Sequence, residues 1–186
     1  GAGGNALFKP TTVGAKYGTV TLTIADAATG LITTTAKVVV SAAKASSATL
    51  TLDKSSYAPG EAFTLTIAAK DANGLQLADG TYGDVTNTYM ATLSSSTLVY
   101  GVGGAVLGGK LAPTFTNGVA TVKGFMPAVS GDVKFTLTLG ATGVATAAQG
   151  AVLTATGTVD NATATAASNA VDAANEATDA ANAATD

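Results

Sequence analysis

Apolar and polar residues alternate along several short segments of this chain, which is the pattern of half-buried β-strands. In residues 17–24, Val20, Leu22 and Ile24 lie on one face and threonines lie on the other. The same alternation recurs in residues 48–52, 63–67, 133–139 and 151–159. Turn sequences such as Asp71-Ala72-Asn73-Gly74 and Asn117-Gly118 separate these segments. Short strands with frequent turns predict an all-β fold, with one β-sandwich over residues 44–159.

The first 43 residues carry only two strand patterns. Residues 17–24 and 31–40 are rich in β-branched side chains, and turn residues lie between them at 26–30. Two strands alone cannot bury a hydrophobic core. We therefore expect residues 1–43 to form a partial β unit, which is either the end of an upstream sandwich or an extra hairpin. A short polar link, residues 41–47, leads into the next unit.

The composition changes at Asp160, where glycine and the β-branched runs end and alanine takes over. Seven-residue repeats begin at Thr165, Asp172 and Asp179. Alanine recurs in them at alternating spacings of three and four, at Ala167, Ala170, Ala174, Ala177, Ala181 and Ala184. This spacing predicts a C-terminal Ala-rich heptad helix over residues 160–186, a stalk with these alanines as a self-association seam. Because each alanine buries little area, a coiled coil and a single helical spacer both stay open.

The composition excludes several classes of chemistry. The 186 residues include 40 Ala, 32 Thr and 22 Gly, but no Cys, His, Trp or Arg. Zinc fingers, iron–sulfur clusters and thiol or imidazole catalysis are therefore excluded. The lack of Arg and the net charge of −3 argue against a nucleic-acid partner. No apolar run approaches the length that spans a bilayer.

The same composition indicates where the protein works. A secreted microbial protein gains from lacking cysteine because free thiols oxidise, and a mildly acidic chain rich in Thr, Ala and Gly fits that setting. We therefore expect an extracellular location at the cell surface. The sequence begins with Gly1 and stops inside the heptad pattern, so we expect it to be part of a longer polypeptide.

Residues 57–74 carry a family resemblance. Tyr57-Ala58-Pro59-Gly60-Glu61 is followed by the alternating strand 63–67 and by the turn at residues 71–74. This order of turn, strand and turn resembles the opening of a bacterial immunoglobulin-like domain of the invasin and surface-layer type. The resemblance implies an immunoglobulin-like sandwich used for display, stalks, adhesion or lattice assembly. It also implies that Tyr57 packs under its turn and that Gly60 adopts a backbone conformation other residues resist. Residues 101–109 depart from the family's compact pattern.

Residues 104–110 match the spacing G-x-x-x-x-G-K of a phosphate-binding loop. Leu111, however, stands where that loop needs Ser or Thr to hold magnesium. We expect instead an exposed glycine-rich loop whose apolar residues dock onto a neighbouring subunit. These residues are Val102, Val106 and Leu107.

Four oxygen-bearing side chains are candidate calcium ligands: Asp71, Asn73, Asp79 and Asp84. The EF-hand spacing fails because Leu75 stands where a third ligand belongs. The competing interpretation is that such residues at turns bond to the nearby backbone. Calcium is the only cofactor that the sequence leaves open.

The sequence carries no recognisable catalytic set, and we expect no enzyme. Ser41-Ala42-Ala43-Lys44 matches S-x-x-K, but it lies in the polar link and lacks the companion motifs. A glycan partner stays open, because Tyr82, Tyr89 and Tyr100 are a candidate cluster for stacking on sugar rings. Asn161-Ala162-Thr163 matches a glycosylation acceptor, a triplet that arises easily by chance in such a tail.

Together these features predict a structural, self-assembling module of a microbial cell-surface protein, in a surface layer, filament or stalk. We expect it to form homo-oligomers through the helix seam and the sheet edges. Two alternatives stay open: an adhesin or carbohydrate-binding module, and a viral fibre or decoration protein.

Overall fold

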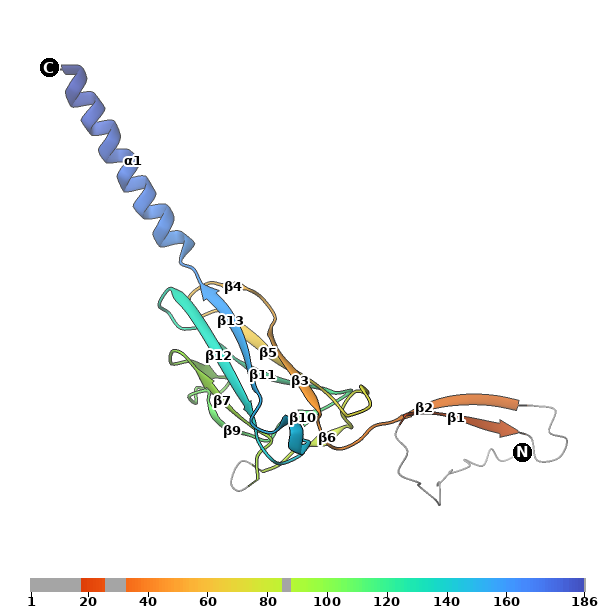
Figure 1. The fold of residues 1–186 in the computed structure, drawn as a ribbon. Coiled ribbons are helices and arrows are strands. Elements are labelled where there is room, and N and C mark those ends of the chain that lie inside the picture. The colour runs from red at the N-terminus through yellow and green to blue at the C-terminus, as the bar shows by residue number, and fades with distance from the viewer. Residues whose placement is uncertain (1–17, 26–32, 85–87, 186) are drawn as a thin grey trace.

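The computed structural model describes residues 18–25, 33–84 and 88–185. Across these residues the chain is mostly β, with one long helix at its C-terminal end (Figure 1). The strands are β1 (Gly18–Ala25), β2 (Thr33–Val40), β3 (Ser47–Leu52), β4 (Ser56–Tyr57), β5 (Ala62–Lys70), β6 (Gly80–Thr81), β7 (Ala91–Ser95), β8 (Tyr100–Gly101), β9 (Gly109–Leu111), β10 (Thr114–Phe115), β11 (Val119–Phe125), β12 (Gly131–Leu139) and β13 (Val152–Val159). The helices are the short 3-10 turn η1 (Thr146–Ala148) and the α-helix α1 (Ala162–Thr185).

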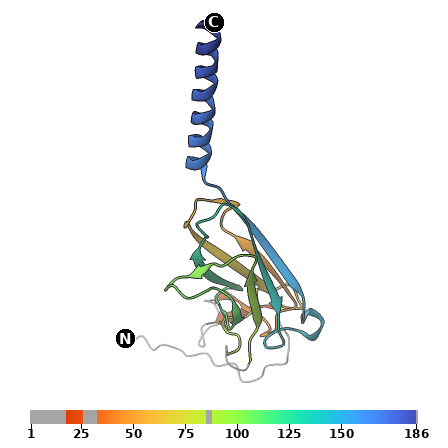
Figure 2. The ribbon, with the colours of Figure 1, turned by 90° about the vertical axis from the view of Figure 1, so that its left-hand side faces the viewer.

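Two sheets form the body of the molecule. One has four strands in the order β3-β5-β11-β8, and the other has five in the order β4-β13-β12-β7-β9. Neighbouring strands are antiparallel, except that β4 runs parallel to β13. The sheets face each other in Figures 1 and 2. Between them the rings of Phe63 in β5 and Phe135 in β12 meet with their centroids 4.9 Å apart, so the arrangement is sandwich-like.

The alternation in the sequence is reproduced in the burial of the strands. The buried residues of β5 and β12 are Phe63, Leu65, Ile67, Ala69, Val133, Phe135, Leu137 and Leu139. The residues between them are more exposed and are mostly threonines and lysines. Burying one large apolar side chain contributes about 1.5–3 kcal/mol, so these residues determine which face of each strand turns inward.

Tyr57 packs under the turn that joins β3 to β5. Its ring is buried, and its hydroxyl donates to Asp53 Oδ1 at 2.8 Å and accepts from the backbone N–H of Lys54 at 3.0 Å. Burial, assisted by the hydrogen bond to Asp53, raises the pKa of Tyr57 to about 12. Gly60 has φ = +73°, a conformation that favours glycine. The burial expected for Tyr57 and the backbone conformation expected for Gly60 are therefore found.

β1 and β2 form a separate two-stranded hairpin, which projects from one end of the body (Figure 1). Gly18 pairs with Val40 and Ala25 pairs with Thr33, so the two strands match along their full length. The predicted pairing of these two strands is present. The turn predicted at residues 26–30 lies outside the described residues.

The segment predicted to be a polar link, residues 41–47, is tied into the body. Ala45 is fully buried, and its N–H donates to the carbonyl of Gly143 at 2.8 Å. The N–H of Ala42 donates to Asp71 Oδ2 at 2.9 Å. This anchoring could not be predicted, because a single small buried residue among polar ones produces no periodic pattern.

The strands between β5 and β12 are mostly short. Residues 75–77 make only one bridge, between Gln76 and Lys70, and β8 has two residues. The Asn117-Gly118 turn is present, with φ of +51° and +71° and with Thr116 opposite Val119. The strand before it, β10, then pairs with β6 instead of β11. Strands of two or three residues are too short for alternation to identify.

The predicted C-terminal helix is present as α1, with 24 residues. It leaves β13 directly, and the N–H of Asp160 donates to the carbonyl of Tyr57 at 2.9 Å. All of its side chains from residue 165 to residue 184 are exposed. The helix projects from the end of the body opposite the hairpin (Figure 2). The division into three units, residues 1–43, 44–159 and 160–186, stays a prediction.

Replacing Phe135 by alanine tests the contact between the sheets. Phe135→Ala leaves a cavity between β12 and β5 and should lower the free energy of unfolding by about 3–5 kcal/mol. Thr154→Ala, on the exposed face of the neighbouring strand, is the control and should cost less than about 1 kcal/mol. Urea unfolding followed by circular dichroism measures both. Equal losses for the two variants would contradict this account of the core.

Candidate functional site

One end of the four-stranded sheet carries exposed apolar side chains on its outer face. The rest of that face is mostly polar, but it also carries Ala68 and Val119, and Val119 is 38% exposed. Its polar residues are Thr49, Thr51, Thr64, Thr66, Thr121 and Lys123. Phe125 of β11 lies opposite Tyr100 of β8, and Tyr100 lies opposite Val106. Their side chains are 44%, 45% and 58% exposed. Directly opposite residues in antiparallel strands share one face of a sheet, so Phe125, Tyr100 and Val106 form one line, here named the apolar row.

Hydrogen bonds place the apolar row at the end of the body that carries the helix. The N–H of Met126, which follows Phe125, donates to the carbonyl of Glu61 at 2.8 Å. Glu61 belongs to the turn that follows Tyr57, and the carbonyl of Tyr57 accepts from Asp160, just before α1. The segment that leads from the hairpin into the body lies at the other end of β5, where the N–H of Ser46 donates to the carbonyl of Lys70 at 2.8 Å. The row and the hairpin are therefore separated by the length of β5, about 27 Å.

Two glycines explain why the aromatic side chains of the row point outward. Gly101 of β8 and Gly124 of β11 lie opposite each other on the inner face of the same strands. A Cβ atom on Gly124 would meet the carbonyl oxygen of Tyr100 at 2.6 Å and the ring of Phe63 at 2.9 Å. The Phe63 ring thus fills the space that an inward side chain would need. In this strand pair the inner positions are glycines, which carry no side chain, and the large side chains of Tyr100 and Phe125 lie on the outer face.

The loop predicted to dock onto a neighbour contributes to this surface in part. Val102 is 69% exposed and Val106 belongs to the apolar row. Leu107 is different, because it is half-buried and packs against the core. The N–H of Leu107 donates to the carbonyl of Val99 at 2.8 Å, so Leu107 is less accessible than Val102 and Val106. Its role as a contact residue stays a prediction. The sequence analysis missed Phe125, whose outward position depends on Gly124.

The outermost strands of the two large sheets are mostly short. β4 and β8 have two residues each and β9 has three, and very short edge strands discourage edge-to-edge association. Longer open edges are those of β3, with six residues, and of β13, which β4 pairs with only at Thr158 and Val159. Assembly through sheet edges stays a prediction, and the apolar row is the stronger candidate surface.

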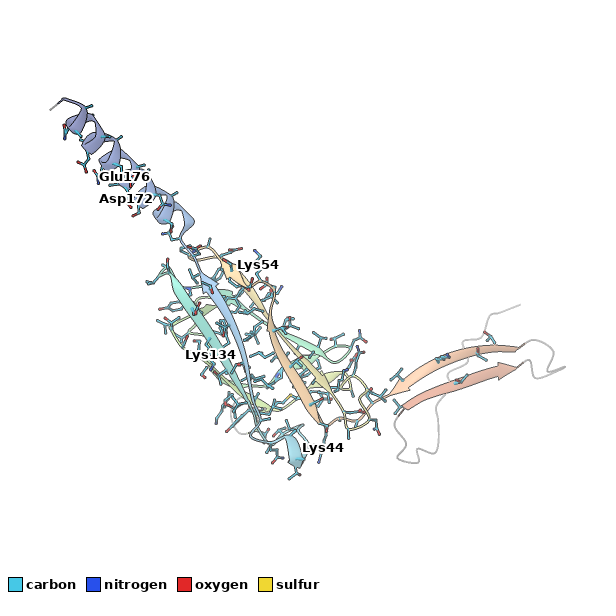
Figure 3. All side chains as sticks on the ribbon, turned by 45° about the horizontal axis from the view of Figure 1, so that its top comes forward. Lys44, Lys54, Lys134, Asp172 and Glu176 are labelled. Carbon is cyan, nitrogen blue, oxygen red and sulfur yellow. The ribbon has the colours of Figure 1, made fainter. Side chains whose placement is uncertain are left out.

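The helix α1 presents two different faces. The six seam alanines, Ala167, Ala170, Ala174, Ala177, Ala181 and Ala184, are all exposed. Asp172, Glu176 and Asp179 are spaced by four and three residues and so share a second stripe away from that seam. Figure 3 shows the first two of these side chains on the projecting helix. The acidic stripe keeps one face in solvent and leaves the alanine seam free of charge.

The three tyrosines considered for sugar binding do not share one surface. Tyr82 is only 7% exposed, and its hydroxyl donates to the carbonyl of Ala78 at 2.7 Å. Its ring lies edge-on to Phe115, with centroids 5.5 Å apart. Tyr89 is half-buried, and the ammonium of Lys110 lies 5.1 Å from its ring centroid. A ring buried in this way cannot stack on a sugar, so Tyr82 drops out of the proposed cluster.

The candidate calcium ligands are mostly engaged by the backbone. Asp71 is 3% exposed; its Oδ1 accepts from the N–H groups of Asn73 at 2.8 Å and Leu75 at 3.0 Å. Burial alone would raise the pKa of this carboxyl, but the N–H groups of Ala42, Asn73 and Leu75 together hold the pKa below its ordinary value. Asp79 accepts from the N–H of Asn117 at 2.7 Å. Within the described ranges, no three acidic side chains come together to hold a metal ion.

Asp71 should stabilise the fold in a pH-dependent way. In Asp71→Asn an amide group replaces the carboxylate oxygen that accepts from Ala42, so at neutral pH the variant should be less stable by about 1–3 kcal/mol. Because the pKa is lower in the folded state, the carboxylate contributes fully above about pH 4, and that contribution is lost as the pH falls through the folded-state pKa. Urea unfolding of both proteins at neutral pH and at about pH 2 measures the difference. A deficit of the same size at both values would contradict the assignment.

The chain matches no protein-family model, and no curated protein matches it in sequence. Over residues 18–25, 33–84 and 88–185, no helix is both long enough and apolar enough to cross a membrane.

Proposed function

We propose that the chain is a structural module of a microbial cell-surface protein and that it works by associating with further copies of itself. The apolar row carries the proposal. In a face covered mostly by hydroxyl and ammonium groups, Tyr100, Phe125 and Val106 form one continuous apolar line. Exposed apolar surface with a polar surround is typical of protein–protein contact sites.

The strand order supports an immunoglobulin-like topology for the body. In that topology one sheet has the order A-B-E-D and the other has G-F-C, extended by C′ in the variable type. The order β3-β5-β11-β8 corresponds to the first sheet and β13-β12-β7-β9 to the second. One departure is that β8 precedes β9 in the chain, whereas D follows C′ in the variable type. The two strands whose order differs, β8 and β9, lie at the two ends of residues 101–109, where the sequence departs from the family pattern.

The arrangement of the ends suits a connecting role. The hairpin projects from one end of the body and α1 from the other (Figure 1), so each end carries an element that can engage a neighbour. The described part of the body has 22 buried apolar residues between hydrogen-bonded strands. Such a body resists deformation, since many hydrogen bonds must break together. Outward threonines keep the sheet faces compatible with water.

The helix would add a second contact of modest strength. Its seam allows close approach of two helices, but alanine contributes little buried area per residue. The tail from Asp160 has five acidic residues and no lysine, and the resulting repulsion opposes pairing at low salt. Helix association should therefore strengthen with salt and with every further heptad.

Sedimentation velocity of the whole chain over a wide concentration range tests the proposal. The sedimentation coefficient should rise with concentration as copies associate. A chain that remains monomeric up to millimolar concentration, at low and at high salt, would contradict it.

A matched pair of helix substitutions tests the seam. Ala174→Glu places a charge in the seam. Asn175→Glu places the same charge at the next residue, which lies outside the seam. Both variants should stay helical by circular dichroism. The first should weaken the helix-dependent part of association by about tenfold and the second by much less. Equal effects would indicate that total charge, and not the seam, controls the helix contact.

A further inference from the structure

We propose that two copies of the chain associate row to row about a two-fold axis, so that Phe125 of each copy enters a hollow beside Val106 of the other. This inference rests on the proposed function and names its contact. The row begins at Phe125 and ends at Val106. At that second end lies a hollow of about 510 Å³, which residues 93–98 and 106–109 line. A surface with an exposed ring at one end and a recess at the other is complementary to a second copy of itself.

The hollow offers apolar contacts to an entering ring. Leu98 and Val106 line it and are 55% and 58% exposed. Leu107 also lines the hollow, and this residue is half-buried against the core. A ring that covers these side chains removes their apolar surface from water, which is the main favourable contribution to protein association.

Two hydroxyl groups in the wall of the hollow already have partners. The Ser95 hydroxyl donates to the carbonyl of Thr97 at 2.6 Å. The Ser96 hydroxyl accepts from the backbone N–H of Lys134 at 2.9 Å. Burial of a polar group is costly when the group lacks a hydrogen bond. A ring that covers this part of the hollow therefore leaves neither serine without one.

The apolar row lies at the centre of a patch large enough for an interface. The N–H of Val102 donates to the carbonyl of Lys123 at 3.3 Å, which continues the pairing of β8 with β11 and sets Val102 on the same face as Tyr100. With Val102 and Leu98 included, the patch exposes on the order of 500 Å² of apolar surface. A standard interface buries about 800 Å² on each partner, with an apolar centre and a polar rim. Thr121 and Lys123, both exposed on the same face, supply such a rim.

Charge does not oppose the approach of two bodies. Residues 44–159 contain six lysines and six acidic residues, so this part of the chain has no net charge. The surplus of negative charge lies in the tail from residue 160. Two neutral bodies therefore meet without the repulsion that limits the pairing of the helices. Association through the row should depend little on salt, in contrast to association through the helix seam.

The unequal ends of the row determine the direction of the two-fold axis. Two faces that pack on each other have such an axis in the plane between them. An axis along the strands, through Tyr100, reverses the row and sets Phe125 of each copy on Val106 of the other. An axis along the row would set Phe125 on Phe125 and leave both hollows unfilled, at a loss of packing contacts. With the axis along the strands, both α1 helices leave the pair at the same end.

Sedimentation velocity tests the contact and its closure. The Ala174→Glu chain, in which the helix seam does not contribute, should pass from monomer to dimer as its concentration rises and grow no further, at low and at high salt. Adding Phe125→Ser should weaken dimerisation at least about tenfold. The control is to add Val119→Ser instead, which removes an exposed apolar side chain from the same face outside the row and should have a much smaller effect. Thermal unfolding followed by circular dichroism verifies that each variant is folded.

Introduced cysteines test the direction of the axis. The chain contains no cysteine of its own, and a disulfide forms only where two Cβ atoms come within about 4.5 Å. Phe125→Cys mixed with Val106→Cys under mild oxidation should give a mixed disulfide dimer in several-fold higher yield than Phe125→Cys alone gives its own dimer. Phe125→Cys mixed with Thr154→Cys, which lies on β13 of the other sheet, is the control and should give little mixed dimer. An affinity tag on one variant separates the products on a gel.

The other outcomes overturn the inference in distinguishable ways. Equal losses for Phe125→Ser and Val119→Ser would show that the row is not the contact. A Phe125→Cys dimer that forms more readily than the mixed dimer would place the axis along the row. Growth beyond a dimer that Phe125→Ser abolishes would show that the row contact is not closed.

The failure of the inference is also distinguishable from the failure of the proposed function. If the Ala174→Glu chain stays monomeric while the unaltered chain associates, the row contact is absent and only the helix contact of the proposed function survives. If the unaltered chain also stays monomeric, the proposed function itself fails.

Discussion

The rings of Phe63 and Phe135 meet between the two sheets, and the rest of the body depends on that contact. The chain is dominated by alanine, threonine and glycine and has only five Phe and five Tyr. With so few large side chains, the core depends on the five aromatic residues that are buried in it. Tyr57, Tyr82 and Phe115 join the two phenylalanines as buried aromatic residues. Tyr100 and Phe125 are exceptions, since they are exposed and lie side by side.

The sequence predicted the regular parts of this fold because they repeat a simple pattern. Buried and more exposed residues alternate over the nine residues of β5 and of β12, and the sequence of α1 repeats every seven residues. Patterns of this length identify an element even where single residues depart from them. The burial of Tyr57 was implied by the resemblance of residues 57–74 to the opening of a bacterial immunoglobulin-like domain. β4, β6 and β9 escaped prediction because strands of two or three residues carry no period and are fixed by their partners alone.

The site was harder to predict, and the reasons are physical. The outward position of Phe125 depends on Gly124, and that glycine is required by the distant ring of Phe63. Alternation alone cannot tell which face of a strand is the inner one when glycine occupies it. Asp71 looked like a metal ligand in the sequence, yet its carboxylate is satisfied by three backbone N–H groups, one of them from Ala42 far away in the chain. Such contacts between distant segments leave no local signal.

Hydrogen–deuterium exchange as a function of protein concentration tests most directly that copies of the chain associate through the apolar row. Amides of residues 99–106 and of the end of β11 at Phe125 should become more protected as the concentration rises, because the row is covered in the assembly. Amides of β12, which lie in the core at any concentration, should not change. Protection of residues 99–106 that is independent of concentration, in a sample that has become larger, would contradict a contact at the row. The same result in a sample that stays monomeric would contradict self-association altogether.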